Sequence, residues 1–455
     1  MADAAPWAEA LAAKQARTAC RYYTKGRCTR GVACPFSHAA ATVSGGSTEK
    51  VKQAPPKVTT EGDADVVSVL REALLKQWRG DGSHHTHMHG FHPRKATMHP
   101  KAVQLLLTLL PGTGPVLDPF VGTGTSAIQV MLQGRQAVGT DVSPLAIGIA
   151  KACCWLPTEE QLEELRQAER RITRSLEQAE KDANTEPGVV FATGCRGARA
   201  REIVRHTIDD SSPEVSLALW FVLDFEERTR HWDWQIDNPN VIEIRSASRR
   251  FRSTVRRFVE KLVDFRAAVP ANTPMAKLMV ADAREQVESF GLLEGVLTSP
   301  PYPGVFDYVE ENEVGEEAGE EKVSTNTGLS DFVERMEGGI DYELEIGSKR
   351  LAARVDADAF RTKWQEDTVA WLTACTARLK IGGRIAMLIG NQTNGINALE
   401  SVKEAVPLCG GEGYTLRVIA AASVREEDRV SRPWGGKWRP YRSEHTILLE
   451  KVMEV

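Results

Sequence analysis

Short apolar runs along the chain alternate with longer stretches in which hydrophobic positions recur every three or four residues. The short runs have the length and composition of buried strands, and they span residues 115–117, 136–139, 278–280, 295–297, 384–389, 414–419 and 444–449. Helical spacing is present over residues 66–78, 99–110, 126–133, 144–153, 159–184, 215–228, 248–268 and 356–379. Because most strand candidates are preceded or followed by a helix, the pattern predicts a three-layer α/β domain with a mixed seven-stranded sheet.

The order of these elements divides the chain into five parts. Residues 14–40 form a small cysteine-rich module, and residues 41–62 are rich in Ala, Ser, Gly, Thr and Pro, which predicts a flexible linker. The α/β domain then occupies residues 63–156 as its first part and residues 271–455 as its second part. Between them, three helical stretches predict a helical insertion over residues 157–270.

Composition narrows the classes of protein that this chain can be. It has 455 residues, 42% of them hydrophobic and 26% charged, as in soluble globular proteins, and no apolar run approaches the roughly 20 residues that cross a bilayer. Eight cysteines are too few for a disulfide scaffold, and residues 1–14 lack a secretion signal. We therefore expect an intracellular protein of the nucleus or cytoplasm, not associated with a membrane; its oligomeric state is left open.

The charge balance limits how the chain can meet a polyanion. With 57 basic and 62 acidic residues, the formal net charge is −5. The chain as a whole is therefore no polycation, and nucleic-acid binding requires local basic segments.

The amino-terminal module carries four metal-ligand residue types within nineteen residues. They follow the spacing C-x7-C-x5-C-x3-H and are Cys20, Cys28, Cys34 and His38. Four such ligands can close a tetrahedral zinc shell, and a module too small for a core must take its folding free energy from the metal. The sequence therefore predicts a structural zinc site.

Aromatic side chains lie among basic residues in the same module. Tyr22 and Phe36 offer faces for base stacking, beside charges that suit phosphates. The module resembles the CCCH zinc-finger family, and this resemblance implies contact with single-stranded RNA. Some fingers of this family contact proteins instead, so that alternative stays open.

A glycine-rich turn joins the first central strand to the following helix. Gly122 and Gly124 lie in this turn, which would let the backbone approach a cofactor closely, and Asp141 at the tip of the next strand could accept two ribose hydroxyls. A strand, glycine turn, helix and strand in this order make a βαβ unit and predict a Rossmann-like fold. The turn alone fits a dinucleotide as well as a nucleoside cofactor.

A second motif, Ser299-Pro300-Pro301-Tyr302, ends a later strand. Two consecutive prolines donate no backbone hydrogen bonds and are stiff in φ, so they hold the carbonyls at the strand end as fixed acceptors. If the Ser299 hydroxyl and the Pro300 carbonyl both accept protons from an exocyclic amine, the nitrogen lone pair points at an incoming methyl group. Tyr302 would stack on the base, which must be flipped or single-stranded to enter.

The two motifs together resemble the S-adenosylmethionine-dependent amino-methyltransferases of nucleic acids, of the N-4/N-6 DNA methylase type. Thr298 to Tyr302 reads TSPPY, the form most similar to the N(4)-cytosine branch. The resemblance implies a Rossmann-like methyltransferase domain in which Ser299, Pro300, Pro301 and Tyr302 are catalytic. It implies a cofactor site in which Asp141 holds the ribose, Asp282 lies near the adenine, and the methionine-side loop consists of Asp118, Phe120, Gly122 and Gly124.

The resemblance also gives a role to a histidine-rich segment just before the cofactor loop. Residues 92–100 look like the segment that these enzymes close over the methionine moiety. A metal site on the histidine tract from His84 to His92 has no carboxylate or thiol spaced to complete it. We therefore favour closure over the methionine moiety as the role of this segment.

Two segments are candidates for contact with the substrate. The loop over residues 429–442 combines two Trp, one Tyr and five basic residues, which favours base stacking with phosphate contacts, and its candidate residues are Arg432, Trp434, Lys437, Trp438 and Arg439. A structural stack of Trp on Arg is the alternative. A basic helix either follows a phosphate backbone or is a solvated face. Its basic residues are Arg245, Arg249, Arg250, Arg252, Arg256, Arg257 and Lys261.

These features predict a DNA- or RNA-binding enzyme. Our leading hypothesis is a site-specific DNA methyltransferase specific for cytosine N(4), acting by direct displacement on a flipped or single-stranded base and carrying a structural zinc finger. The first alternative is an RNA amino-methyltransferase guided by the finger, acting on adenine N(6), cytosine N(4) or guanine N(2). The second is an inactive adaptor that only binds nucleic acid.

Overall fold

The computed structural model describes most of the α/β region. Its described residues are 57–79, 86–92, 97–185, 206, 208, 210–233, 247–285, 290–308, 328–338, 344–391, 395–425 and 443–454. The chain separates into two compact units, Met1–Ala54 and Pro55–Val455. The first unit, with the predicted zinc ligands, lies outside the described residues, all of which belong to the second.

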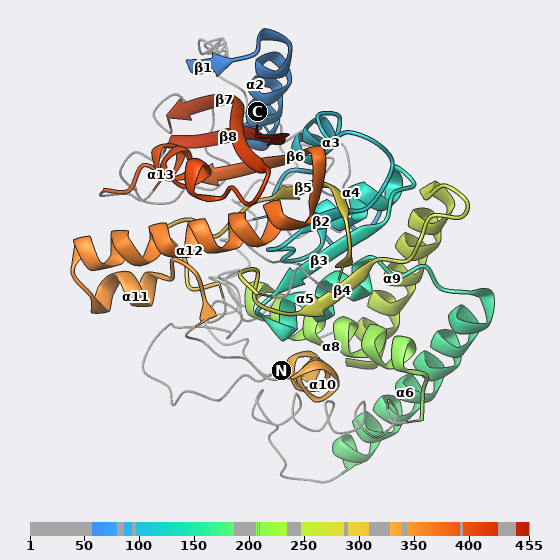
Figure 1. Ribbon diagram of the computed structural model, residues 1–455. Coiled ribbons are helices and arrows are strands. Elements are labelled where there is room, and N and C mark those ends of the chain that lie inside the picture. Colours follow the sequence, from blue (N-terminus) through green and yellow to red (C-terminus); the bar gives the residue numbers. More distant parts are fainter. Residues whose placement is uncertain are drawn as a thin grey trace, which may run out of the picture. The chain divides into compact units, whose positions relative to one another are not determined.

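A mixed sheet of eight strands forms the middle layer (Figure 1), in the order β1-β7-β8-β6-β5-β2-β3-β4. The strands are β1 (Val58–Gly62), β2 (Val116–Asp118), β3 (Ala137–Asp141), β4 (Lys277–Val280), β5 (Leu293–Thr298), β6 (Leu379–Gly390), β7 (Tyr414–Arg425) and β8 (Ser443–Met453). From β4 to β6 all neighbours are parallel, whereas β8, β7 and β1 pair antiparallel. This confirms the Rossmann-like α/β class.

The eighth strand corrects the prediction of seven strands. β1 lies inside the segment 41–62 that we expected to be a linker, and it pairs with β7 at the edge of the sheet. Four of its five residues are exposed. An edge strand held through its backbone buries few side chains, and for that reason no apolar pattern marks it.

Helices cover both faces of the sheet and create two cores. The helices of the α/β domain are α2 (Ala64–Arg79), α3 (Pro100–Leu107), α4 (Thr125–Leu132), α5 (Pro144–Cys153), α10 (Gly328–Glu337), α11 (Lys349–Arg354), α12 (Ala357–Arg378) and α13 (Ala398–Ala405). Along β6, Ile385 and Met387 pack in the core under α12 and α13, while Ala386 and Leu388 pack in the core under α2 to α5. This alternation is that of a strand buried on both faces.

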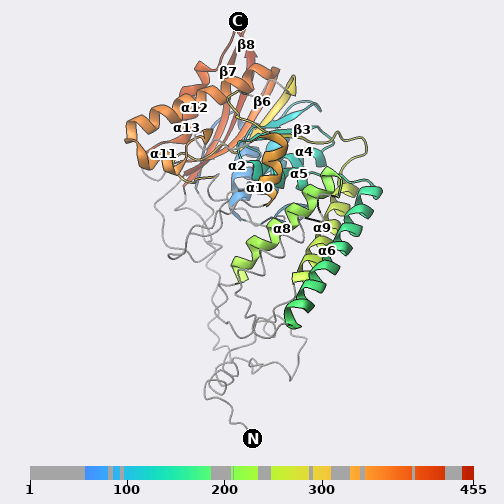
Figure 2. The ribbon, with the colours of Figure 1, turned by 90° about the horizontal axis from the view of Figure 1, so that it is seen from below.

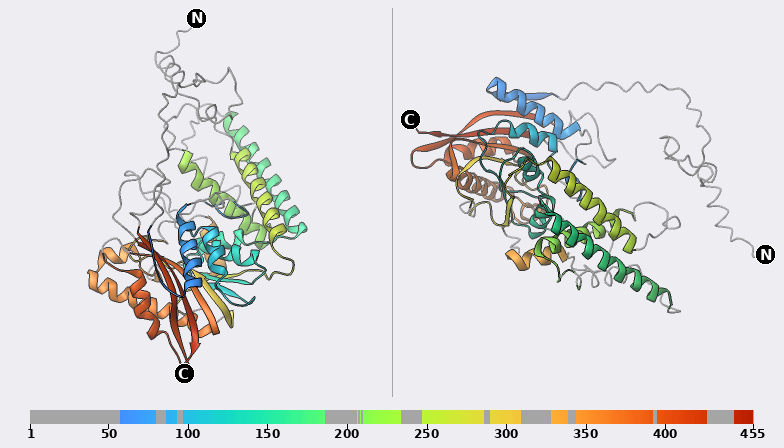
Figure 3. Two further views of the ribbon diagram at one scale, coloured as in Figure 1. Left: turned by 90° about the horizontal axis from the view of Figure 1, so that it is seen from above. Right: turned by 90° about the vertical axis from the view of Figure 1, so that its right-hand side faces the viewer.

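The predicted helical insertion contains three long helices, α6 (Glu159–Thr185), α8 (Pro213–Asp233) and α9 (Ala247–Ala268). They pack on one another and extend away from the sheet (Figures 2 and 3). α8 also contacts α5, and α10, which the apolar pattern did not predict, packs against both. The insertion is therefore anchored beside the first βαβ unit. Among the described residues, no helix is both long enough and apolar enough to span a membrane.

Candidate cofactor and acceptor cleft

A cleft of about 880 Å³, partly open to solvent, lies at the carboxyl ends of the parallel strands. β2 has β3 on one side and β5 on the other, so the order of strands along the chain reverses at β2. Ligands of open α/β sheets bind in the crevice at such a switch point. The predicted site residues that line the cleft are Asp118, Phe120, Gly122, Asp141, Asp282, Ser299 and Pro301. The two sequence motifs therefore meet in one cavity.

The two glycines of the turn have different surroundings. Gly122 has φ +51°, and a Cβ there would meet only the Phe120 carbonyl oxygen, at 3.9 Å. Gly124 has φ +84° and caps α4, where a Cβ would lie 3.2 Å from the Cα and Cβ of Ala150 on α5. Gly122 thus leaves open space beside the cleft. Gly124, which does not line the cleft, lets α4 and α5 pack closely.

Backbone donors hold the carboxylate of Asp141 at the mouth of the turn. The Gly122 N–H donates to Oδ2 at 3.0 Å and the Ser143 N–H donates to Oδ1 at 2.9 Å. These two bonds fix the orientation of the carboxylate at the end of β3. This geometry fits a ribose.

Asp118 is buried beneath the cleft and binds three donors. Thr298 Oγ1 donates at 2.6 Å and the Phe120 N–H at 3.0 Å to Oδ1, and the Ser126 hydroxyl donates to Oδ2. Burial raises the pKa of Asp118 to about 6, although these hydrogen bonds act in the opposite direction. Asp118 therefore ties the end of β2 to the end of β5 and to the start of α4.

Asp282 is neutralised by a neighbouring arginine. Arg284 Nη2 lies 2.6 Å from Asp282 Oδ2 and Nη1 lies 2.6 Å from Asp367 Oδ1 on α12. Nη2 also donates to the Leu344 carbonyl at 3.2 Å. Burial lowers the pKa of Arg284, but the bonds to the two carboxylates outweigh it and raise this pKa. The arginine joins three segments around one end of the cleft.

The predicted catalytic motif, Ser299 to Tyr302, is divided between the cleft and the sheet. Ser299 and Pro301 line the cleft, whereas Pro300 and Tyr302 are not among the lining residues. The Tyr302 ring lies on Gly390 at the end of β6, where a Cβ would come within 2.4 Å of it, and the hydroxyl is 3.4 Å from Glu444 Oε1. The structure thus places the ring against the end of β6, and its stacking on a base stays a prediction.

Another aromatic residue, which the sequence analysis missed, does line the cleft. The Tyr308 hydroxyl accepts a hydrogen bond from the Tyr302 N–H at 3.2 Å. The Tyr308 N–H donates to Glu345, which also lines the cleft and bonds Arg350 Nη2 at 2.9 Å. The only feature of the sequence that could have indicated Tyr308 is its place as an aromatic residue six positions after Tyr302. The fold-back of residues 344–350 onto 302–308 is what positions it.

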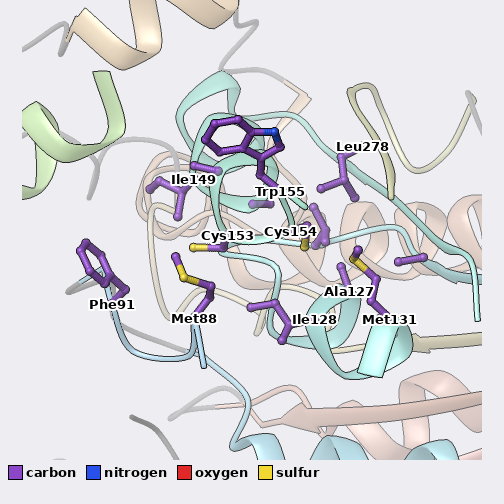
Figure 4. Close-up of a cluster of buried hydrophobic side chains, with 14 of the residues drawn as sticks. Met88, Phe91, Ala127, Ile128, Met131, Ile149, Cys153, Cys154, Trp155 and Leu278 are labelled. Atoms are coloured by element: carbon purple, nitrogen blue, oxygen red, sulfur yellow. The ribbon is translucent and has the colours of Figure 1, made fainter. Parts of the chain in front are cut away.

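A second, smaller cavity, also partly open to solvent, adjoins the cleft. Thr97, Met98, Thr123 and Thr125 line both, and the second cavity is also lined by Met88, His89, Gly90, His92, Pro100, Ile128 and Cys153. Figure 4 shows Met88, Ile128 and Cys153 in the buried cluster next to it. Part of the segment that we expected over the methionine moiety therefore borders this cavity.

Metal ligation is not supported for the histidines that the structure describes. Among the described residues, no group of three or more His, Cys, Asp and Glu side chains could hold a metal ion. His89 Nε2 lies 2.8 Å from Gln129 Nε2, and His92 Nε2 lies 2.7 Å from Asp224 Oδ2. His84 and His85 lie outside the described residues.

Several predicted binding residues also lie outside the described residues. They are Cys20, Cys28, Cys34, His38, Tyr22, Phe36, Arg432, Trp434, Lys437, Trp438 and Arg439. The strand ends that flank the loop are described. Arg425 of β7 pairs with Ser443 of β8, and Glu444 pairs with Gly390 of β6. The described strand ends on either side of the loop therefore lie near Gly390, against which the Tyr302 ring packs.

Basic side chains of helix α9 make contacts within the chain. Arg252 lies 3.3 Å from Glu169 and 3.2 Å from Glu177, both on α6. Lys261 Nζ donates to the His87 carbonyl at 2.6 Å. These contacts favour structural roles for Arg252 and Lys261 over binding of phosphates. Arg245 lies outside the described residues.

Comparisons with known proteins bear on both units. Residues 15–39, which span the four predicted ligands, match the family described as zinc finger C-x8-C-x5-C-x3-H type (and similar). Over 66 residues, 14% of the chain, the sequence is 38% identical to the type II methyltransferase M.MjaII of Methanocaldococcus jannaschii. That match spans only 12% of the relative.

Two solved structures are similar at low identity. TrmN from Thermus thermophilus is 13% identical with a TM-score of 0.28, over 79% of this chain and 50% of that chain. The rRNA methyltransferase aviRa from Streptomyces viridochromogenes is 13% identical with a TM-score of 0.28, over 81% of this chain and 93% of that chain. By its sheet topology and its family match, the chain combines a Rossmann-like α/β domain with a segment that matches CCCH zinc fingers.

Proposed function

We propose that this chain is an S-adenosylmethionine-dependent methyltransferase that modifies the exocyclic amine of a nucleobase, with cytosine N(4) of DNA as the first candidate. The observation that carries the proposal is the meeting of Gly122 and Asp141 with Ser299 and Pro301 in one cleft. A cofactor site and an acceptor site that share a cavity are what direct group transfer requires. The similarity to a type II methyltransferase over 66 residues supports the same class.

The residues that line the cleft suit the cofactor. Asp141 would accept the ribose hydroxyls, the open space at Gly122 would admit the cofactor close to the backbone, and the end near Asp282 would take the adenine. The adjoining cavity, bordered by Thr123 and His92, would take the amino-acid end. When bound, S-adenosylmethionine supplies an electrophilic methyl group on a sulfonium.

The acceptor side would hold and orient the amine. The Ser299 hydroxyl and the Pro300 carbonyl would each accept one N–H of the amine, which frees the nitrogen lone pair for the methyl carbon. One N–C bond forms as one S–C bond breaks, and the displaced proton leaves to solvent. No covalent enzyme intermediate is required. The thiols agree with this, since burial raises the pKa of Cys153 to about 12 and places that of Cys154 well above the usual value.

The nature of the nucleic acid gives a second candidate function. The match of residues 15–39 to CCCH zinc fingers favours RNA, because the finger would hold a single strand for the α/β domain. An RNA amino-methyltransferase would act on adenine N(6), cytosine N(4) or guanine N(2). Structural zinc, held by Cys20, Cys28, Cys34 and His38, belongs to either candidate.

One experiment tests the class of reaction and the substrate together. The full chain is incubated with labelled S-adenosylmethionine and either DNA or RNA, and the nucleic acid is digested to nucleosides for mass analysis. We expect labelled N(4)-methyl-2′-deoxycytidine from DNA; a product from RNA alone selects the second candidate. Absence of any labelled nucleoside, with no binding of the cofactor in a titration, would overturn the proposal in favour of an inactive adaptor.

Matched variants assign the two halves of the cleft. Asp141→Asn should weaken cofactor binding at least about tenfold, because an amide nitrogen cannot accept from a hydroxyl. Pro301→Ala should lower methyl transfer about a hundredfold while leaving cofactor binding within about twofold, because it loosens only the acceptor side. Full activity in Pro301→Ala would contradict the role of the motif.

A further inference from the structure

The segment that borders the second cavity is held by the helical insertion. Met88, His89, Gly90 and His92 line this cavity. On the cavity side, His89 Nε2 is 2.8 Å from Gln129 on α4. On the other side, the contacts of the segment run to α8 and α9. This segment and residues of the first βαβ unit therefore form part of the cavity wall, and α8 and α9 contact the segment from behind.

One of these contacts is a buried pair between His92 and Asp224. The two side chains are 2.7 Å apart at Nε2 and Oδ2, and they are 3% and 0% exposed. Removal of one partner of a buried polar pair is strongly destabilising, because the other group is left in a medium that cannot hydrate it. Asp224 of α8 therefore fixes the position of His92 in the cavity wall.

An aromatic cluster holds the neighbouring residue, Phe91, in place. The Phe91 ring lies 5.4 Å from that of Phe221, 5.1 Å from Phe225 and 5.5 Å from Phe258 between ring centroids. The guanidinium carbon of Arg257 lies 4.6 Å from the centroid of Phe91 and 4.7 Å from that of Phe225. Such a cation–π contact has the geometry of a stabilising interaction. Arg257 thus covers this aromatic cluster. Its positive charge therefore has a structural role that does not require a nucleic acid.

Two further contacts restrain the start of the segment. His87 has φ +48°, a left-handed backbone that residues other than glycine adopt infrequently. Lys261 of α9 donates to the His87 carbonyl at 2.6 Å, and Asp264 lies 2.8 Å from His87 Nδ1. A conformation of this kind persists when its surroundings hold it. Residues 87, 91 and 92 are therefore each attached to the insertion.

We infer that the helical insertion sets the affinity for the amino-acid end of the cofactor, with Asp224 as a positioning residue that acts through His92. This inference rests on the proposed function, which places the amino-acid end of S-adenosylmethionine in the second cavity. Loss of Asp224 removes the contact that fixes the His92 imidazole, so this part of the cavity wall must be ordered again on binding. The adenine and ribose contacts at Asp282 and Asp141 are untouched.

Two classes of ligand separate this role from general support of the fold. S-adenosylmethionine and S-adenosylhomocysteine carry the amino-acid end, whereas 5′-methylthioadenosine lacks it and retains adenine and ribose. Calorimetric titration of the full chain is expected to show that Asp224→Ala raises the Kd of the first two about tenfold or more. The Kd of 5′-methylthioadenosine should change by less than about twofold, because its contacts are remote.

Three variants complete the test. Asp224→Asn keeps an acceptor for His92 and should recover most of the affinity. Lys261→Met leaves the buried pair intact and should give a smaller loss in the same direction, which keeps the inference testable where Asp224→Ala does not fold. Arg252→Gln is the matched control, since Arg252 joins α9 to α6 through Glu169 and Glu177; it should bind all three ligands as wild type does.

The outcomes distinguish this inference from the proposed function. Wild-type chain that binds none of the three ligands refutes the cofactor assignment, and the inference with it. If the wild-type chain binds the ligands, and Asp224→Ala and Lys261→Met bind them with the same affinities as wild type, the inference alone is overturned. An equal loss for 5′-methylthioadenosine and S-adenosylmethionine would also overturn it, because the insertion would then support the whole domain and not the amino-acid end.

Discussion

The buried carboxyl group of Asp118 should make the stability of the α/β domain depend on pH. Its side chain accepts from Thr298, from the Phe120 N–H and from Ser126, and burial raises its pKa from 3.8 to about 6. Asp118→Asn is the informative change. The asparagine oxygen can keep the bonds to Thr298 and Phe120, while its NH₂ group donates to the Ser126 oxygen, so the packing is preserved and the charge is removed.

The size and the sign of the effect depend on the two pKa values. Between pH 3.8 and about 6 the folded chain holds the Asp118 proton while the unfolded chain releases it. The unfolded state thus binds fewer protons in that window, so stability falls as pH rises and the loss is complete above about pH 6. A shift of about two pKa units at about 1.4 kcal/mol each amounts to about 3 kcal/mol.

Urea unfolding followed by tryptophan fluorescence measures this effect as a difference between variants. Between about pH 4 and about pH 7, the unfolding free energy of Asp118→Asn should gain up to about 3 kcal/mol relative to wild type. Asp118→Ala should be less stable than Asp118→Asn at every pH, because the Thr298 hydroxyl and the Phe120 N–H lose their acceptor at about 1–3 kcal/mol each. A wild-type to Asp118→Asn difference that does not vary with pH would refute the raised pKa.

Three other perturbations address the catalytic element, the helix packing and the finger. Tyr308→Phe removes the acceptor of the Tyr302 N–H. The rate constant of single-turnover methyl transfer should therefore fall about tenfold, with the Kd of S-adenosylmethionine unchanged. An unchanged rate constant would contradict this role of Tyr308. Gly124→Ala should lower the unfolding free energy about 1–3 kcal/mol more than Gly291→Ala, since both have positive φ but only the former meets α5; equal losses would contradict this. Cys20→Ser should reduce bound zinc from about one ion per chain in elemental analysis, and undiminished zinc would exclude Cys20 as a ligand.

Much of the fold was readable from the sequence because its signals are local. The seven strands that the apolar runs predicted are all present, since strands covered on both faces need continuous hydrophobic residues. The glycine turn and the proline pair were recognisable because each restricts its own backbone. β1 escaped prediction because its pairing with β7 depends on backbone groups, which every residue type carries.

The assignment of side chains to the cleft depended on contacts between distant parts of the chain. Gly122 and Gly124 are two residues apart in one motif, yet only the position of α5 makes one an open approach and the other a packing site. Tyr308 enters the cleft because residues 344–350 fold back on it. His92 and Asp224 are 132 positions apart, and nothing near either residue marks the other.

The sequence alone therefore determined the α/β class, the strand ends and the chemistry present at them, because these depend on local backbone preferences and on hydrophobic spacing. Only the tertiary structure decided which of those groups share a cavity and which helices support its wall. The physical reason is that such contacts are selected by the packing of the whole domain, in which a side chain's neighbours are set by the positions of entire helices and strands.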